Sequence, residues 1–148
     1  MTRKLFVNLP VARLGRAVDF FTQLGFAFDE DFADETSACM VVNDSTYVML
    51  LMQERFAGFT SKAIADTSTH TEALFAVQVG DRDEVDGLVE MALANGATAA
   101  GEPQDHEFMY VRSFNDPDGH TWEFFWLDES DEDDDEHDLA AEDEGPGE

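Results

Sequence analysis

The sequence predicts an α+β fold made of two β-α-β-β-β modules in tandem, followed by a disordered acidic tail. Two observations predict the modules: strand-like runs alternate with helical segments, and the same order of elements occurs twice. A third predicts the tail, because residues 128–148 hold 13 of the 34 acids and neither Lys nor Arg. We expect one domain over residues 1–127, with modules at 1–52 and 72–127 and a connector at 53–71.

The first module opens with a strand, KLFVNLPV, at residues 4–11. A helix is predicted next, because apolar residues recur at helical spacing before a glycine that suits a helix end; they are Leu14, Ala17, Val18 and Phe21, followed by Gly25. Three short strands follow at residues 26–32, 37–42 and 46–52, with Asn43-Asp44 as the hairpin between the last two. The connector is polar, and its Phe56, Phe59 and Ile64 suit either a short packed helix or a lid.

The second module repeats this order after a strand at residues 72–79. Asp81 and Glu84 have the spacing of a helix capping box. One helical face follows and ends at Asn95-Gly96; its residues are Val85, Leu88, Val89, Ala92 and Leu93. Strands are predicted at residues 98–100, 107–114 and 120–127, with the turn Asp116-Pro117-Asp118-Gly119 between the last two.

The repeat allows the two modules to be aligned with each other. Phe6 then matches Leu74, Val11 matches Val79 and Gly25 matches Gly96. The stretch VVNDSTYVMLLM lies over SFNDPDGHTWEFF, with one extra residue in the second turn. Under this alignment Leu50 takes the place of Glu123. Strand alternation then puts Val48, Leu50 and Met52 on the same face as Thr121, Glu123 and Phe125.

The charge balance excludes several kinds of partner. The formal net charge is −26, and even residues 1–127 hold 21 acids against 8 bases. Nucleic acids and anionic membranes bind clustered Lys and Arg, so we expect neither as a partner. We interpret the acid excess as a source of solubility. No signal-peptide core or membrane-spanning run occurs, which favours a cytoplasmic location.

The opening LFVNLPVARLGRAVDFFTQLGF and the closing NDPDGHTWEFF, together with the internal repeat, resemble the vicinal oxygen chelate superfamily. This superfamily includes glyoxalase I, extradiol dioxygenases and bleomycin-resistance proteins. The resemblance covers residues 1–127 and implies the glyoxalase-like fold, in which the two modules form a cupped mixed sheet. It also implies a homodimer. Function has to be argued from the site, because one fold hosts many activities.

The resemblance implies positions for metal ligands. Metal-binding members use a His or Gln on the first strand of a module and a Glu on its last strand. Carried over by position, these places hold Phe6, Leu74, Leu50 and Glu123. Only Glu123 can coordinate a metal ion, whereas a catalytic centre needs about three protein ligands. We therefore expect no cofactor, and a divalent metal only if an atypical site exists.

The histidines do not rebuild such a site in the sequence. His70, His106, His120 and His137 show no pair at ligand spacing, so surface or turn roles are predicted for them. His106 precedes a strand from which it can reach the cup. Cys39, the single cysteine, is interpreted as a small buried apolar residue.

Strand alternation predicts the residues that line the cup. The predicted ligand-binding residues are Phe6, Asn8, Val48, Leu50, Met52, Leu74, Ala76, Gln78, Tyr110, Arg112, Thr121, Glu123 and Phe125. Mostly apolar walls with a few polar groups are typical of a small-molecule site. The expected ligand is a small hydrophobic or aromatic molecule.

Glu123 lies between Trp122 and Phe124 in an aromatic strand, where an unpaired buried carboxylate is costly. Two hypotheses stay open. Either Glu123 anchors a ligand, or it pairs with Arg112 or Tyr110 of the preceding strand and only supports the sheet.

The leading hypothesis is a metal-free, homodimeric small-molecule-binding protein of this superfamily. The alternative is an enzyme, namely a metal-dependent lyase, isomerase or dioxygenase with an atypical site, or one in which Glu123 is the catalytic general base. A third hypothesis is an interaction module that works through the acidic tail.

Overall fold

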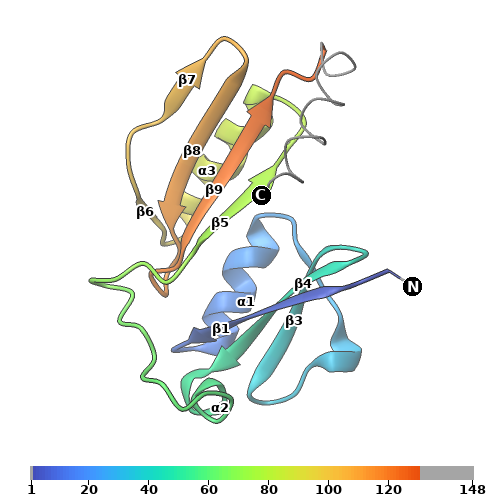
Figure 1. Ribbon diagram of the computed structural model, residues 1–148, viewed down its shortest axis with the longest axis vertical. Helices are drawn as coiled ribbons and strands as arrows, with labels where there is room; N and C mark the ends of the chain where they lie inside the picture. The colour runs from blue at the N-terminus through green and yellow to red at the C-terminus, as the bar shows by residue number, and fades with distance from the viewer. Residues whose placement is uncertain (1, 131–148) are drawn as a thin grey trace, which may run out of the picture.

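The computed structural model describes residues 2–130, which form two β-sheets, each covered on one face by a helix (Figure 1). The first module contains β1 (Leu5–Val11), α1 (Leu14–Gln23), β2 (Ala27–Phe28), a 3-10 turn (Glu30–Phe32), β3 (Ser37–Asn43) and β4 (Thr46–Met52). The second contains β5 (Leu74–Gln78), α3 (Arg82–Ala94), β6 (Thr98–Ala99), β7 (Gln104–His106), β8 (Met109–Asn115) and β9 (Thr121–Leu127). The predicted tandem order is confirmed. The disorder predicted for the tail concerns residues beyond Ser130, which lie outside the described part of the chain.

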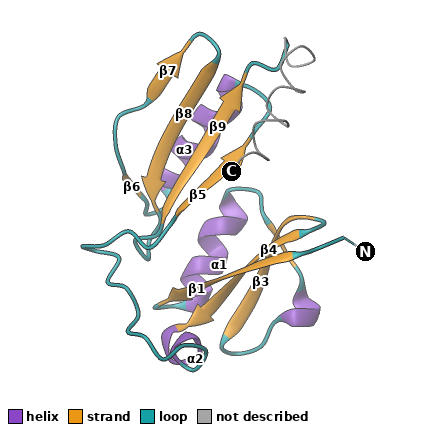
Figure 2. Cartoon of the chain, viewed as in Figure 1, coloured by secondary structure: helices purple, strands orange, loops and turns teal. Residues whose placement is uncertain are grey.

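The connector begins with a short helix, α2 (Gln53–Ala57), and then runs as loop to β5 (Figure 2). The strand predicted at residues 26–32 is shorter than expected. After Phe28 the chain turns, because the Asp29 carboxylate accepts a hydrogen bond from the N–H of Asp31 at 3.0 Å. No helix in the described part of the chain is long and apolar enough to cross a membrane.

The two sheets have matching strand orders, β1-β4-β3-β2 and β5-β9-β8-β6, and β7 pairs with the far end of β8. In both sheets the first strand pairs in parallel with the last strand, Phe6 opposite Tyr47 and Leu74 opposite Thr121. The remaining neighbours are antiparallel. β1 and β5 are therefore edge strands, and each leaves one side of its backbone unpaired.

One hydrophobic core joins the two modules. It contains buried side chains of α1 and α3 and of the sheet faces that these two helices cover. Phe21 of α1 packs against Trp122 of β9 with ring centroids 5.1 Å apart, and Phe20 meets Phe114 of β8 at 6.0 Å. Burial of such large rings stabilises the fold by roughly 1.5–3 kcal/mol each. The modules are thus packed as one unit through α1.

The helix caps differ between the modules. In α3 the Asp81 carboxylate accepts the N–H of Glu84 at 2.8 Å, which confirms the predicted cap. α1 begins after Arg13 without any side-chain cap of its own. Asp118, from the turn of the other module, bonds the chain just before the helix and a side chain of its first turn: its Oδ1 accepts the N–H of Ala12 at 2.9 Å and the Arg16 guanidinium at 3.0 Å. A carboxylate at this end also complements the helix dipole.

Asp116 organises the turn that carries Asp118. Its buried carboxylate accepts the N–H groups of Asp118 and His120 through Oδ1 and the indole N–H of Trp122 through Oδ2, at 2.9 to 3.0 Å. Burial raises the pKa of Asp116, although the nearby His120 and these hydrogen bonds act in the opposite direction. The Asp-Pro-Asp-Gly motif is therefore a structural joint between the modules.

The connector docks on the same turn. Thr67 donates its hydroxyl to the carbonyl of Asp118 at 2.5 Å. Gly119 has a φ of +85°, and a Cβ at this position would clash with the Thr67 side chain. Only glycine satisfies both the backbone conformation and the close approach.

We expect Gly119→Ala to destabilise the protein more than Gly25→Ala does. Gly25 has a similar φ of +92° but nothing within 4 Å of its would-be Cβ. Gly25→Ala therefore reports the backbone strain alone, about 1–3 kcal/mol, and Gly119→Ala adds a clash of about the same size. Urea unfolding measures both variants. Equal losses would show that Thr67 does not hold the turn.

Candidate functional site

Eight of the predicted ligand-binding residues lie on the open faces of the sheets, the faces opposite the helices. The alternation is set by the core residues of the same strands, whose neighbours in sequence point the other way. These eight are Phe6 and Asn8 of β1, Leu74, Ala76 and Gln78 of β5, and Thr121, Glu123 and Phe125 of β9. Phe6 and Leu74 are 46% and 60% exposed, so apolar surface is uncovered on both faces.

The prediction for β4 is wrong by one residue. Val48 and Leu50 are buried in the core on the helix-covered face, and Met52 has the same alternation. With Phe6 and Leu74 equivalent, the strand pairings make Met49 the counterpart of Glu123, because Asn8 pairs with Met49 and Ala76 with Glu123. A thioether replaces the aliphatic side chain that was expected there.

The prediction for β8 is also wrong. Tyr110 and Arg112 point to α3, where the Tyr110 hydroxyl donates to Asp86 at 2.6 Å and Arg112 donates to Asp86 and Glu90 at 2.9 Å. The Tyr110 hydrogen bond, followed by that of Arg112, lowers the pKa of Asp86 despite partial desolvation. Neither residue pairs with Glu123, so the hypothesis of a structural pair with Arg112 or Tyr110 fails.

Glu123 lies in the middle of the open face of the second sheet. Its cross-strand neighbours are Ala76 on β5 and Ser113 on β8. Within residues 2–130 its carboxylate has no hydrogen bond or ion pair, whereas Gln78 donates to Glu129 and Thr121 to Asn115. The side chain is only partly exposed. Glu123 is therefore a carboxylate available to a ligand.

The open face of the first sheet carries an aromatic pair that the sequence analysis missed. Phe6 and Tyr47 stack with ring centroids 4.7 Å apart and planes 13° apart, and Lys4 Nζ lies 5.6 Å from the Tyr47 centroid. The one-residue error in β4 removed Tyr47 from the predicted set. Tyr47 is identified from the parallel pairing of β1 with β4, because this pairing puts the Phe6 and Tyr47 rings opposite each other.

His120 is occupied within the protein. The ring is 1% exposed, its Nδ1 lies 2.6 Å from Glu72 Oε2, and its Nε2 lies 2.7 Å from the carbonyl oxygen of Pro10. Both partners are acceptors, so both ring nitrogens must carry a proton and the imidazolium is the form that fits. Burial lowers the pKa of His120, but the charge of Asp116 and the bonds to Pro10 and Glu72 outweigh it and raise the pKa.

Strand pairing puts His106 of β7 and Cys39 of β3 on the open-face sides of their sheets, opposite Met109 and Met49, whereas His70 lies in the connector. His70 contacts Thr69 in the connector, and His106 is an exposed residue of β7 that stacks on Phe108. Cys39 is buried, as expected, and burial raises the pKa of its thiol. His137 lies outside the described residues.

The donors present do not fit a metal of the kind the superfamily uses. The four equivalent strand positions hold Phe6, Leu74, Met49 and Glu123, of which only Glu123 offers an oxygen donor to a hard divalent ion. Over the described range, no group of three His, Cys, Asp or Glu side chains is close enough to hold an ion.

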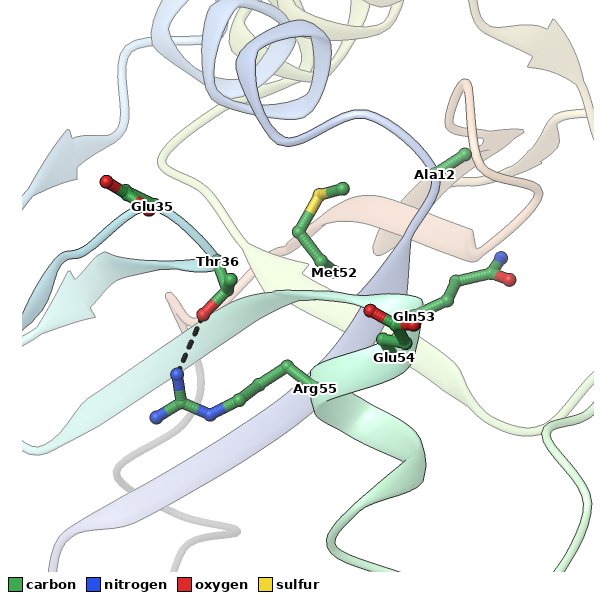
Figure 3. Close-up of a pocket in the computed structure, with 7 residues that line it drawn as sticks. All are labelled: Ala12, Glu35, Thr36, Met52, Gln53, Glu54 and Arg55. Atoms are coloured by element: carbon green, nitrogen blue, oxygen red, sulfur yellow. Dashed lines mark hydrogen bonds between the residues drawn. The ribbon is translucent and has the colours of Figure 1, made fainter.

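A separate cleft of about 850 Å³ lies beside the end of β4 and the start of α2 (Figure 3). Met52 is the one predicted ligand-binding residue that lines it. Arg55 Nη1 donates to Thr36 Oγ1 at 2.7 Å and to Asp34 at 3.3 Å. The Thr36 N–H and hydroxyl hold the pKa of Asp34 well below its usual range. Arg55 is thus bonded within the protein, whereas the carboxylates of Glu35 and Glu54, which also line the cleft, have no hydrogen-bond partner within residues 2–130.

The geometry defines a protein with paired β-α-β-β-β modules, in which each sheet has one face left open by the helices. The profile of the Glyoxalase/Bleomycin resistance protein/Dioxygenase superfamily matches residues 5–124. The chain belongs to this superfamily. Comparison with curated proteins gives no significant match.

Solved structures show the same fold. A hypothetical protein from S. aureus is 24% identical, with 86% of this chain and 95% of that chain covered and a TM-score of 0.74. A glyoxalase-related enzyme from Fulvimarina pelagi is 19% identical, with 85% and 88% covered and a TM-score of 0.72. TioX from Micromonospora sp. ML1 is 22% identical, with 85% and 99% covered and a TM-score of 0.61. At these identities the likeness establishes the fold alone.

We expect stability to fall as the pH rises above the ordinary His120 value of 6.5. A raised folded-state pKa means that the imidazolium contributes fully below 6.5 and that this contribution is lost as the pH passes the folded-state pKa. A tenfold difference in proton affinity between the folded and unfolded chain corresponds to about 1.4 kcal/mol of stability. Urea unfolding across this window measures the loss. His120→Gln, which cannot titrate, should show a flatter curve, and parallel curves would contradict the assignment.

Two acid-to-amide substitutions on one hairpin should differ in their effect on stability. Glu123→Gln should change the free energy of unfolding by less than about 0.5 kcal/mol, because Glu123 has no partner in the described structure. Asp118→Asn should cost about 1–3 kcal/mol, because it weakens charge-assisted bonds to Arg16 and Ala12. Thermal unfolding compares them. A large loss in Glu123→Gln would give that residue a structural role instead.

Proposed function

We propose that this protein binds a small planar organic molecule without using a metal, and that it does so as a homodimer. The observation that carries the proposal is the composition of the open faces. One face offers the stacked rings of Phe6 and Tyr47, and the other offers the carboxylate of Glu123, which has no partner within residues 2–130 and lies between Ala76 and Ser113. Apolar walls with a few polar anchors are the usual make-up of a small-molecule site.

The dimer is supported by the apolar surface on the edge strands. Leu5 and Phe6 of β1 and Leu74 of β5 are 46–60% exposed. Exposed apolar patches on soluble chains mark interaction surfaces, and a second copy of this chain would cover them. A ligand on an open face would then be enclosed between two chains.

The ligand class follows from the side chains. Stacked aromatic rings favour a flat aromatic ligand, since offset stacking adds about 0.5–1.5 kcal/mol beyond area burial. An unpaired carboxylate favours a ligand with a positive charge or a hydrogen-bond donor. A planar aromatic cation combines both properties. Its binding would involve Phe6, Tyr47 and Glu123.

Proflavine, a fluorescent planar cation, tests this proposal on the full chain. We expect saturable binding, with Phe6→Ala and Glu123→Gln each weakening it about tenfold, which corresponds to about 1.4 kcal/mol. Phe108→Ala and Glu107→Gln are the matched controls, because they remove an exposed ring and a carboxylate on the loop after β7. Equal weakening by the controls would mean that proflavine binds the acidic surface nonspecifically and would overturn the proposal.

Two further readouts separate the alternatives. Light scattering should give the mass of two chains, and a monomer that binds proflavine normally would remove the dimer from the proposal. Elemental analysis follows incubation with nickel, zinc, iron and manganese and removal of loose ions. It should be done on a variant without residues 128–148, whose carboxylates bind ions nonspecifically. One tightly held ion per chain would favour the enzyme hypothesis instead.

A further inference from the structure

A second cavity lies between the end of β1, the helix α2 and the connector. Its volume is about 230 Å³. Pro10, Phe56 and Ile64 supply apolar walls, and Lys62, Glu72 and His120 supply the polar part. Pro10 continues the alternation of Phe6 and Asn8 on β1, but it is buried at the end of the strand. The cavity contains none of Phe6, Tyr47 and Glu123, so it is separate from the site proposed above.

One wall of the cavity is fixed and electrically neutral. His120 is bonded through both ring nitrogens, to Glu72 and to the Pro10 carbonyl, so the imidazolium offers no further N–H. Its positive charge balances the carboxylate of Glu72 at 2.6 Å. The same His120 links β1 to β9 and holds this wall in place. An apolar ligand can pack here without leaving a charge uncompensated.

Lys62 carries the remaining charge among the residues that line the cavity. In the described structure its ammonium has no hydrogen bond, ion pair or aromatic contact, although the chain holds 34 acids against 8 bases. Its backbone N–H donates to Thr60 Oγ1 at 3.1 Å, which fixes the local turn of the connector. The chain has one other lysine, Lys4, which lies over Tyr47. An unpaired ammonium at an apolar cavity matches the carboxylate of a ligand.

We propose that this cavity binds a small monocarboxylate with an aromatic or branched aliphatic body. The body would contact Pro10, Phe56 and Ile64, and the carboxylate would meet Lys62. The volume lies below the 300–1,000 Å³ of drug-sized sites, which limits the ligand to about ten non-hydrogen atoms. A second negative charge is disfavoured, because Lys62 can compensate only one carboxylate and the net negative charge of the chain would repel another.

Benzoate is the probe, titrated into the full-length protein while backbone amide signals are followed by NMR. We expect saturable shifts over residues 56–72 and at His120. Lys62→Gln should weaken binding about fivefold, the size of an exposed ion pair. Lys4→Gln, the other lysine, should bind as the wild type does. Glu123→Gln should also leave benzoate binding unchanged, which separates this site from the open faces.

Two comparisons test the shape and the charge of the site. Ala63 lines the cavity, so Ala63→Phe should fill it and abolish the shifts. Benzyl alcohol, the neutral analogue, should bind more weakly than benzoate. The proposal is overturned by the absence of saturable shifts, by shifts centred on Phe6 and Glu123, or by equal binding in Lys62→Gln. If Ala63→Phe does not fold, the two lysine variants and benzyl alcohol still decide.

Discussion

The buried carboxylate of Asp116 is the constraint on which the rest of the structure depends. The chain has a large excess of acidic residues, and a buried carboxylate is costly. Asp116 is nevertheless stable in the interior because its carboxylate accepts hydrogen bonds from three N–H groups. Those bonds fix the turn, and the turn aims Asp118 at the start of α1 and His120 at the end of β1. Within residues 2–130, these polar bonds supplement the apolar contacts between the modules, and a fully satisfied polar network makes such packing more specific.

Much of this arrangement follows from sequence patterns, because the patterns are local. Helical spacing before Gly25 and Gly96, the Asp81 cap and the two hairpins all involve residues within one element or its flanks. The register of β4 was harder to predict from sequence. Side chains alternate between the two faces of a sheet with a period of two, so an alignment error of one residue moves every side chain of the strand to the opposite face. This exchange moved Val48 and Leu50 to the wrong face and left Tyr47 unnoticed.

The partners of charged residues were not predictable in the same way. Arg112 and Glu123 lie on neighbouring strands, yet Arg112 reaches α3, because Asp86 and Glu90, 26 and 22 positions away in sequence, lie above it. Likewise, nothing in the sequence indicates that His120 meets Pro10, or that the connector passes over both. Such contacts depend on how finished elements pack, and packing is decided by the whole chain rather than by a window of it.

The joint between the modules also has a consequence for the order of events during synthesis. The bond between Ala12 and Asp118 spans 106 positions, and that between His120 and Pro10 spans 110. A ribosome therefore releases the first module long before Asp118 and His120, which join it to the second module, are made. Contacts of such separation carry a large loop-closure cost and slow folding. Until β8 and β9 are made, the apolar side of α1 lacks Phe114 and Trp122, its aromatic partners in the second module, and the nascent chain must remain soluble in that state.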